Sequence, residues 1–505
     1  MTRPRHPATA RRRFAAGTSV LLIAAAASVA AAAGQQPVPH IPLMTGWKVK
    51  PAPALKGPVE GFFRPDFDDS AWATADIKVG EPPYKARFVL YRRWVQVPVS
   101  WKRKPVSIAF GAVDDDAVVY VNGRKVGRHM GWDQAFALDV TKVVKCGARN
   151  LVAVLADNSG GGASGIWKPV SFVLAGELER IEAAGEAAAR AKQATVRNEF
   201  KRVPCQIVYE THREGNWELF LVNADGSHPV NLTRTPDVDE LYPHVSPDGT
   251  KVCFVVDKGK GKDKVRSVYY MHMDGTGRIL VARHARQACW GLDGGTIAYL
   301  KGEFDRFRYT DFATRGIFFY NLKSGEHRQH PNKEIKHLYN LCTVPGGKWF
   351  VATVHGGMGF KHAILAIEAD GPKVFNLGIG GCRPDVSPDG KQIAWGVSDW
   401  ALRVGELDFS SPQPRVIHQR NIVTSKKPMK IYHLDWSPDG RHIAFSRGPT
   451  GKTLGHACEI VGIPAKGWNI CVADATQTNH WAPITSDGLC NKEPDWVPAR
   501  QEPRP

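Results

Sequence analysis

Residues 435–445 read DWSPDGRHIAF, and close copies occur at 385–395 (DVSPDGKQIAW) and 244–254 (HVSPDGTKVCF). When the chain is aligned on the position of Trp436, six equivalent anchor positions appear: Val245, Trp290, Thr343, Val386, Trp436 and Trp496. Their spacings lie between 43 and 60 residues. Periods of about 40–50 residues are typical of propellers and solenoids. The repeat therefore predicts a series of similar structural units.

Each repeat has the pattern of a small antiparallel sheet. Asp-Gly follows four anchors, at 248–249, 293–294, 389–390 and 439–440, and Gly-Gly follows a fifth at 346–347. These pairs tolerate the positive φ of tight hairpins, and short runs rich in β-branched and aromatic residues come next. The last copy, PDWVP at 494–498, has no strand after it, whereas residues 207–209 (IVY) match 443–445 (IAF). We predict that the first strand completes the last blade and closes a ring of six.

This region resembles the propeller of TolB and its relatives, whose repeat reads P-x-W-S-P-D-G-x-x-I-A-F. The resemblance covers about 205–500 and depends on EPDW at 493–496 and the three SPDG copies. It implies a six-bladed β-propeller over 203–500. Such propellers act as scaffolds, receptors and enzymes, so the resemblance does not identify a function.

Residues 40–175 have a different texture, with DFDDSAW at 66–72, YRRWVQVP at 91–98 and an Asn-Gly turn at 122–123. The alternating runs predict antiparallel sheet. The stretch resembles the N-terminal sugar-binding domain of family 2 glycoside hydrolases, which implies a jelly-roll β-sandwich of the galactose-binding type. Those enzymes carry catalysis in a separate (β/α)₈ barrel, and nothing in this sequence has that pattern. The overall expectation is an all-β chain: a sandwich, a helical linker at 176–202, and a propeller.

The resemblance implies structural roles for most of the motif residues, namely Tyr91, Arg92, Asp114, Asp115, Asn122 and Gly123. Loop residues are better candidates for ligand contact, because indole faces stack on sugar rings and nearby polar groups bond hydroxyls. The candidates are Trp132, Asp133, Asn158, Ser164 and Trp167. The alternative is that Trp132 and Trp167 only cover the end of the sandwich.

Residues 1–33 have the layout of an export signal. Five arginines precede an Ala-rich apolar run that ends in an A-x-A site, and Arg11-Arg12-Arg13-Phe14 also fits a twin-arginine pattern. An uncleaved anchor is the alternative, and no later stretch is apolar enough to span a membrane. We therefore expect a periplasmic or extracellular protein, and a disulfide among Cys458, Cys471 and Cys490 would suit that compartment.

The formal net charge is +18, and it is +13 without residues 1–33, which carry five arginines and no acid. A basic surface suits an anionic polysaccharide, and export argues against a nucleic-acid partner. The sharpest basic run, KGKGKDKVR at 258–266, is interpreted as a solvated hairpin loop.

Polar residues precede the anchors by one and three positions, whereas the position between them is mostly apolar. Since side chains alternate along a strand, we predict that this polar set lines the propeller channel: Tyr242, His244, Arg383, Asp385, His433, Asp435, Glu493 and Asp495. Such a ring suits a divalent metal or a sugar acid held by Arg383. The alternative is a hydrated polar channel whose aspartates bond turn amides.

Three hypotheses follow. The first, which we favour, is an exported non-catalytic protein of the cell envelope that binds carbohydrate, a protein partner or both. The second is a polysaccharide-active enzyme, a glycoside hydrolase or uronate lyase, that works in the propeller channel. The third is a structural envelope scaffold. The sequence has no G-x-S-x-G, Walker A or H-E-x-x-H motif, and we predict no required cofactor.

Overall fold

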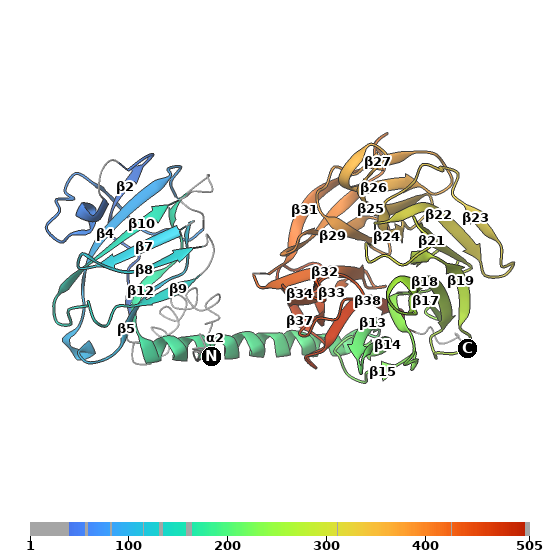
Figure 1. Ribbon diagram of the computed structural model, residues 1–505, viewed down its shortest axis with the longest axis horizontal. Helices are drawn as coiled ribbons and strands as arrows, with labels where there is room; N and C mark the ends of the chain where they lie inside the picture. Colours follow the sequence, from blue (N-terminus) through green and yellow to red (C-terminus); the bar gives the residue numbers. More distant parts are fainter. Residues whose placement is uncertain are drawn as a thin grey trace, which may run out of the picture. The chain divides into compact units, whose positions relative to one another are not determined.

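The computed structural model describes residues 40–55, 59–80, 83–114, 116–130, 135–157, 164–310, 312–425 and 427–499. The predicted export signal lies outside the described residues. The chain divides into two compact units, Met1–Ala191 and Lys192–Pro505. Both units are built from antiparallel strands, so the described residues are all-β apart from α2 (Ala175–Glu199) and four short 3₁₀ turns (Figure 1).

The first unit is a β-sandwich. One sheet has the order β1 (His40–Pro42), β12 (Val170–Leu174), β5 (Val106–Phe110) and β9 (Phe136–Asp139). The other has the order β3 (Ala73–Ala75), β2 (Trp47–Ala52), β4 (Phe88–Gln96), β10 (Arg149–Asp157), β7 (Asp116–Val121) and β8 (Arg124–Met130). A short pair, β11 (Gly165–Ile166) and β6 (Val113–Asp114), completes the fold.

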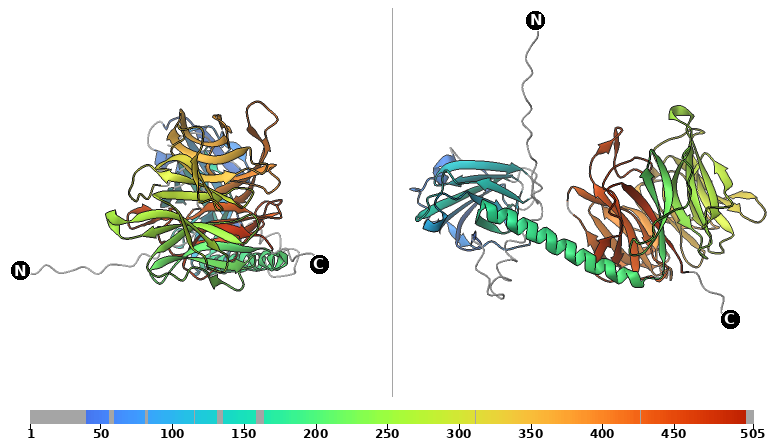
Figure 2. Two further views of the ribbon diagram at one scale, coloured as in Figure 1. Left: turned by 90° about the vertical axis from the view of Figure 1, so that its right-hand side faces the viewer. Right: turned by 90° about the horizontal axis from the view of Figure 1, so that it is seen from below.

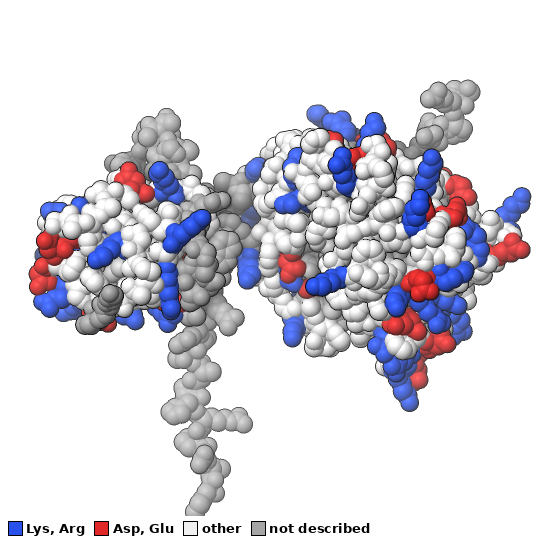
Figure 3. All heavy atoms as spheres, turned by 90° about the horizontal axis from the view of Figure 1, so that it is seen from above, with Lys and Arg blue, Asp and Glu red and all other residues white. Residues whose placement is uncertain are grey.

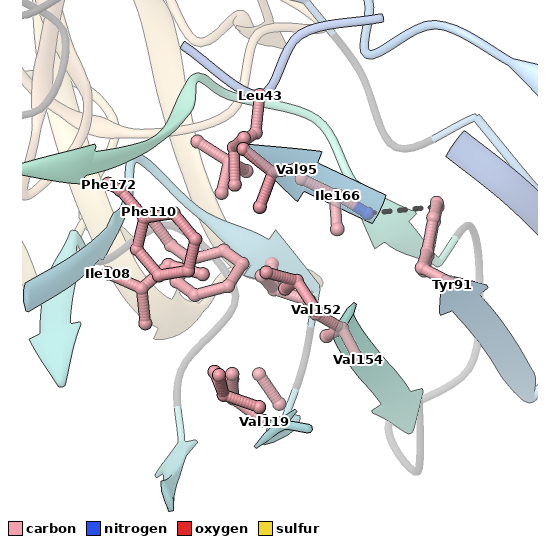
Figure 4. Packing of buried hydrophobic residues seen from close by; sticks show 14 of the residues in the cluster. Leu43, Tyr91, Val95, Ile108, Phe110, Val119, Val152, Val154, Ile166 and Phe172 are labelled. Atoms are coloured by element: carbon pink, nitrogen blue, oxygen red, sulfur yellow. Dashed lines mark hydrogen bonds between the residues drawn. The ribbon is translucent and has the colours of Figure 1, made fainter. Parts of the chain in front are cut away.

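Alternate residues of the two sheets form the sandwich core. Ile108, Phe110 and Phe172 from the smaller sheet meet Val119 and Val152 from the larger one, and all five are fully buried (Figure 4). The outer face of the larger sheet is covered in turn by the segment that contains η1 (Val59–Phe63) and Trp72. The alternation seen in the sequence therefore corresponds to a sheet that is buried on both faces over part of its area.

Helix α2 is a single continuous helix (Figure 2) and continues into η3 (Phe200–Arg202). Its last turns pack on the propeller, because Val196 and Phe200 are buried among blade residues. Arg197 Nε donates to the carbonyl of Asp225 at 2.6 Å. No helix among the described residues is long and apolar enough to cross a membrane.

Residues 206–497 fold into six four-stranded sheets, numbered here as blades 1 to 6. Blade 1 contains β16 (Asp239–Val245), β17 (Lys251–Lys258), β18 (Val265–His272) and β19 (Ile279–Arg283). Blade 2 contains β20 (Ala285–Trp290), β21 (Thr296–Gly302), β22 (Thr314–Asn321) and β23 (His327–Gln329). Blade 3 contains β24 (Leu338–Thr343), β25 (Trp349–Gly357), β26 (Phe360–Glu368) and β27 (Val374–Asn376).

Blade 4 contains β28 (Cys382–Val386), β29 (Gln392–Ser398), β30 (Ala401–Asp408) and β31 (Arg415–Thr424). Blade 5 contains β32 (Met429–Trp436), β33 (His442–Pro449), β36 (Asn469–Asp474) and β37 (Trp481–Pro483). Blade 6 contains β38 (Cys490–Val497), β13 (Gln206–Arg213), β14 (Asn216–Asn223) and β15 (Val230–Asn231). A small hairpin, β34 (Lys452–Thr453) and β35 (His456–Ala457), is inserted between β33 and β36.

The first strand of each blade contacts the first strand of the next, and β38 contacts β16 again, so the six blades form a closed ring. The same anchor pairing recurs: Trp436 pairs with Ile443 in blade 5, and Trp496 pairs with Ile207 in blade 6. This confirms the prediction that the N-terminal strand completes the last blade.

The repeated SPDG turns have one hydrogen-bond pattern. In blade 5, the Ser437 hydroxyl donates to Asp439 and accepts the amide of His442 at 2.9 Å, while Asp439 Oδ1 also accepts the amide of Arg441 at 3.0 Å. Gly440 has φ of 68°, where a Cβ is strained. The repeated SPDG sequence therefore encodes this hydrogen-bonded turn.

All nine cysteines lie within the described residues and all are free, so the predicted disulfide is wrong. Cys471 lies on β36, and burial raises its thiol pKa to about 12. Cys490 Sγ accepts the amide of Ala465 at 3.2 Å, and Cys458 lies beside the Thr453 hydroxyl. These thiols act as small buried groups.

Charged residues of both signs are interspersed on the propeller face shown in Figure 3. The basic run at 258–266 divides into two parts. Residues 258–263 are exposed, as predicted for a hairpin loop. Arg266, in contrast, is buried and makes a bidentate ion pair with Asp257, with two N–O distances of 2.8 Å.

Candidate functional site

The inner strands of the propeller share a β-bulge that the sequence pattern did not reveal. In all six blades the residue three positions before the anchor has a left-handed φ between 46° and 57°: Tyr242, Gln287, Asn340, Arg383, His433 and Glu493. The strand register shifts at the same place. A bulge bends a strand and re-aims its side chains. The simple alternation predicted from the sequence is therefore interrupted beside the channel.

Three predicted channel aspartates connect neighbouring blades. Asp385 Oδ2 accepts the amide of Trp436 at 2.7 Å, and Asp435 Oδ2 accepts that of Trp496 at 2.9 Å. Asp495 Oδ1 accepts the amide of Val245 at 2.8 Å. Each carboxylate thus bonds the anchor of the following blade. Their first role is to join the blades of the ring.

The proximity of these carboxylates changes their acidity. Burial raises the pKa of Asp435 well above its ordinary value, and the charges of Asp495 and Asp385 raise it further. Burial also raises the pKa of Asp385, although bonds from the Cys342 thiol and the Trp436 amide oppose the shift. Like charges in one buried place disfavour full ionisation.

His244 and Tyr242 precede the anchor of blade 1. His244 Nδ1 lies 2.8 Å from Asp495 Oδ2. Burial lowers the pKa of His244, but the charge and hydrogen bond of Asp495 outweigh that effect and raise it overall. Tyr242 is buried, and its amide donates to Glu210 at 3.0 Å. Burial and the charge of Glu493 raise the pKa of Glu210.

Arg383, His433 and Glu493 form a second group. Arg383 Nη1 lies 2.9 Å from Glu493 Oε1, and His433 Nε2 lies 3.2 Å from the same oxygen. Burial, followed by the charges of Arg383 and Lys492, lowers the pKa of His433 well below its ordinary value, so the imidazole is neutral. The guanidinium of Arg383 therefore already faces a carboxylate, which disfavours the predicted use of Arg383 to hold a sugar acid.

The structure brings four of the predicted channel residues together, namely His244, Asp385, Asp435 and Asp495. It brings three others together around Glu493, whereas Tyr242 contacts Glu210 and Gln287. Among the described residues, however, no three His, Cys, Asp or Glu side chains form a group that can hold a metal ion. One oxygen of each aspartate is instead directed to a backbone amide of the next blade, while the other oxygen of Asp495 faces His244 and that of Asp385 accepts the Cys342 thiol. Whether these residues line an open channel stays a prediction.

A pocket of about 530 Å³ lies where the inner strands β24, β28 and β32 begin. Its lining comes from these inner strands, from the second and third strands of blades 3 and 4, and from the connections between second and third strands in blades 2, 4 and 5. Aromatic and histidine side chains dominate it: Tyr309, Phe312, Tyr339, His355, His362, Tyr432 and His433. The sequence prediction included only His433 of these. Tyr339 and Tyr432 lie on the inner strands but outside the two polar positions that the repeat singled out, and Tyr309 and Phe312 lie in a connection outside the repeat. The aromatic run FRYTDF at 307–312 was the available signal.

In the sandwich, the loop candidates fall into two sets. Trp132, Asp133 and Asn158 lie outside the described residues. Ser164 is fully buried, and its hydroxyl donates to the carbonyl of Asp114 at 3.3 Å. Trp167 is 8% exposed, and the Lys168 ammonium lies 4.1 Å from its ring centroid. The ligand contacts of these residues stay a prediction, and the contacts of Ser164 are those of a structural residue.

The predicted structural roles of Tyr91, Arg92 and Asn122 are confirmed. Arg92 is buried, bonds Asp69 at 2.7 Å, and donates to three backbone carbonyls. Tyr91 Oη accepts the amide of Ile166 at 3.1 Å (Figure 4). Asn122 has φ of 52° in its turn and bonds Asn150 at 2.8 Å. Asp115 lies outside the described residues.

Comparison with known proteins gives a family match within the first unit. The family model for the sugar binding domain of glycosyl hydrolases family 2 matches residues 64–169. A β-glucuronidase of Bacteroides fragilis is 32% identical over 87 residues, which are 17% of this chain and 12% of that protein. A β-galactosidase of Thermoanaerobacter pseudethanolicus is 43% identical over 74 residues, 14% of this chain and 10% of that protein.

Among solved structures, TolB from Acinetobacter baumannii has a TM-score of 0.43 and 17% identity, and the match covers 69% of this chain and 79% of that one. The chain thus spans about a tenth of the length of the curated relatives that it matches. The family match lies wholly within the sandwich. That unit is therefore similar to the sugar-binding domain of family 2 glycoside hydrolases, as the sequence motifs implied.

Proposed function

We propose that this chain is an exported, non-catalytic carbohydrate-binding protein of the cell envelope. Its sandwich recognises a glycan and its propeller provides a further surface for glycan or an envelope protein. The match of residues 64–169 to a sugar-binding family supports the first part most directly. The proposed periplasmic or extracellular location rests on the signal-like sequence at 1–33.

The hydrogen bonds of the inner strands support the non-catalytic interpretation. Asp385, Asp435 and Asp495 each accept the backbone amide of the next blade's anchor. A general acid or base must reach the proton that it transfers, whereas one oxygen of each of these aspartates is held by a backbone amide. These bonds support the part of the sequence-based alternative in which the aspartates bond backbone amides.

The test is a glycan-array screen of residues 34–505 with two variants of the sandwich, Trp132→Ala and Trp167→Ala. We expect binding by the wild type and at least tenfold weaker binding by one or both variants, measured at a temperature where circular dichroism shows each variant still folded. Trp94→Ala is the matched control, because Trp94 is 38% exposed on β4 of the same sandwich. Equal binding by both variants would contradict the proposed site.

Two further outcomes decide between the alternatives. Release of reducing ends or unsaturated uronates from a bound polysaccharide would establish the enzyme. An array without signal, together with co-purification of an envelope protein, would establish the scaffold.

A further inference from the structure

The propeller pocket has the size and shape of a small-molecule site. Its volume of about 530 Å³ falls within the range of roughly 300–1,000 Å³ usual for ligand pockets. Four blades contribute to its lining, so the ring closure that brings them together also forms the pocket. The pocket is separate from the sandwich, and the family match does not reach it.

One wall of the pocket is aromatic. Phe312 and His355 stack with their ring centroids 4.1 Å apart. Tyr309 lines the same pocket and packs against His456, with ring centroids 4.5 Å apart. Tyr309 and Phe312 come from the β21–β22 connection, and both are only half-buried. Partly exposed aromatic faces in a concave site suit a ligand that has an apolar face of its own. Pyranose rings have such faces, formed by their C–H groups.

The charges of the pocket disfavour an anionic ligand. Lys430 Nζ lies 2.8 Å from Asp399 Oδ2 and 2.6 Å from Glu459 Oε1. Arg383 is paired with Glu493 at 2.9 Å. Two cations thus face three carboxylates, and an acidic sugar would have to displace one of these carboxylates. The same pairs disfavour a cationic ligand, since Lys430 already occupies the place between Asp399 and Glu459.

Glu459 supplies an acceptor for a hydroxyl group. Its Oε1 bonds Lys430, whereas its Oε2 is buried and makes no hydrogen bond with any described residue. Buried polar atoms are nearly always hydrogen-bonded, so this oxygen is satisfied when a donor enters the pocket. We propose that the propeller pocket binds an uncharged pyranose unit of a glycan, stacked on the Phe312 wall and bonded through a hydroxyl to Glu459.

The test is titration calorimetry of residues 34–505 with four neutral tetrasaccharides: cellotetraose, mannotetraose, galactotetraose and xylotetraose. Tetragalacturonate and tetraglucosamine serve as acidic and basic probes. We expect at least one neutral probe to bind more tightly than both charged probes. Phe312→Ala and Tyr309→Ala should each weaken that binding at least tenfold at unchanged unfolding temperature.

Phe304→Ala is the matched control, because Phe304 is 41% exposed on the same β21–β22 connection and does not line the pocket. Trp132→Ala should leave this binding unchanged, which separates the pocket from the sandwich site. Three results would overturn the proposal: tighter binding of a charged probe, unchanged affinity in both aromatic variants, or no binding of any neutral probe. If only Trp132→Ala lost binding, the result would support the sandwich site and reject the pocket as the binding site.

Discussion

At the scale of single residues, aspartate has two roles in this propeller: it closes turns, and it joins neighbouring blades. Asp439 lies in an exposed turn, where burial raises its pKa but bonds from His442 and Ser437 outweigh that effect and lower it overall. Asp435 lies between blades, where burial and the charges of Asp495 and Asp385 raise its pKa. The sequence offers both as members of one repeated DWSPDG motif. Their surroundings set their ionisation in opposite directions.

Asp435→Asn should therefore reduce the dependence of stability on pH. A carboxyl whose folded pKa exceeds the unfolded value of about 3.9 is protonated in the folded state at low pH, and its contribution to stability is lost as pH rises. An amide oxygen still accepts the Trp496 amide but has no charge. We expect the urea midpoint of the wild type to fall further between pH 4.5 and 8 than that of Asp435→Asn.

Asp439→Asn is the control, because the pKa shift of Asp439 has the opposite sign to that of Asp435. Its depressed folded pKa gives stability that is present above the unfolded pKa and lost as pH falls, so this variant should be weakened at neutral pH by about 1 kcal/mol. Equal pH slopes for the wild type and Asp435→Asn would show that Asp435 does not titrate in this way.

At the scale of an element, a single buried lysine holds the long connection between β33 and β36. Lys492 lies on β38 and is fully buried. Its ammonium donates to the carbonyls of Cys458, Ile460 and Ile463 at 2.5, 3.1 and 2.9 Å. Burial lowers its pKa, and the charges of Cys490 and Glu210 oppose the shift. The same connection contains Glu459, which lines the propeller pocket. Lys492 therefore helps to position that side of the pocket.

Lys492→Met should loosen this connection without breaking the ring. The substitution keeps much of the side-chain volume but leaves three buried carbonyls without a donor, and we expect a loss of about 3 kcal/mol in the free energy of unfolding. Hydrogen exchange should accelerate at 458–463 more than elsewhere in blade 5. Lys466→Met is the control, since Lys466 is exposed in the same connection. Unchanged exchange at 458–463 would refute this role for Lys492.

At the scale of the whole molecule, the chain has two separate sets of core residues. Trp47 is fully buried in the sandwich and donates to the carbonyl of Leu43 at 2.7 Å. Trp395 is fully buried in the propeller and donates to the carbonyl of Gly380 at 2.9 Å. Each tryptophan packs only with residues of its own unit. The two cores therefore have separate determinants of stability.

We expect two unfolding transitions in calorimetry of residues 34–505. Trp47→Ala should lower one of them and Trp395→Ala the other, each by the equivalent of about 3–5 kcal/mol. Circular dichroism of the near-ultraviolet region would assign the transitions. A single transition that both variants shift together would show that the units unfold as one.

The sequence predicted the repeating parts of this fold better than the unique parts. Anchor spacing, SPDG turns and the match of 207–209 to 443–445 together predicted the ring, because each blade repeats one set of local constraints. The bulges were missed, since a left-handed residue such as Arg383 or Glu493 needs no glycine. The pocket was missed for a different reason: its Tyr309, Phe312 and Glu459 lie in connections that differ between blades.

Closure of the ring has a consequence for the timing of synthesis. The hydroxyl of Thr211 on β13 bonds Asn491 on β38, 280 residues later in the chain. A ribosome adds about 5–20 residues per second, so β13 waits roughly 15–60 s before its partner strand exists. During that interval the nascent propeller has an unpaired edge at each end. An unpaired strand edge can pair with another chain. The newly made chain is therefore most prone to aggregate in the interval before the ring closes.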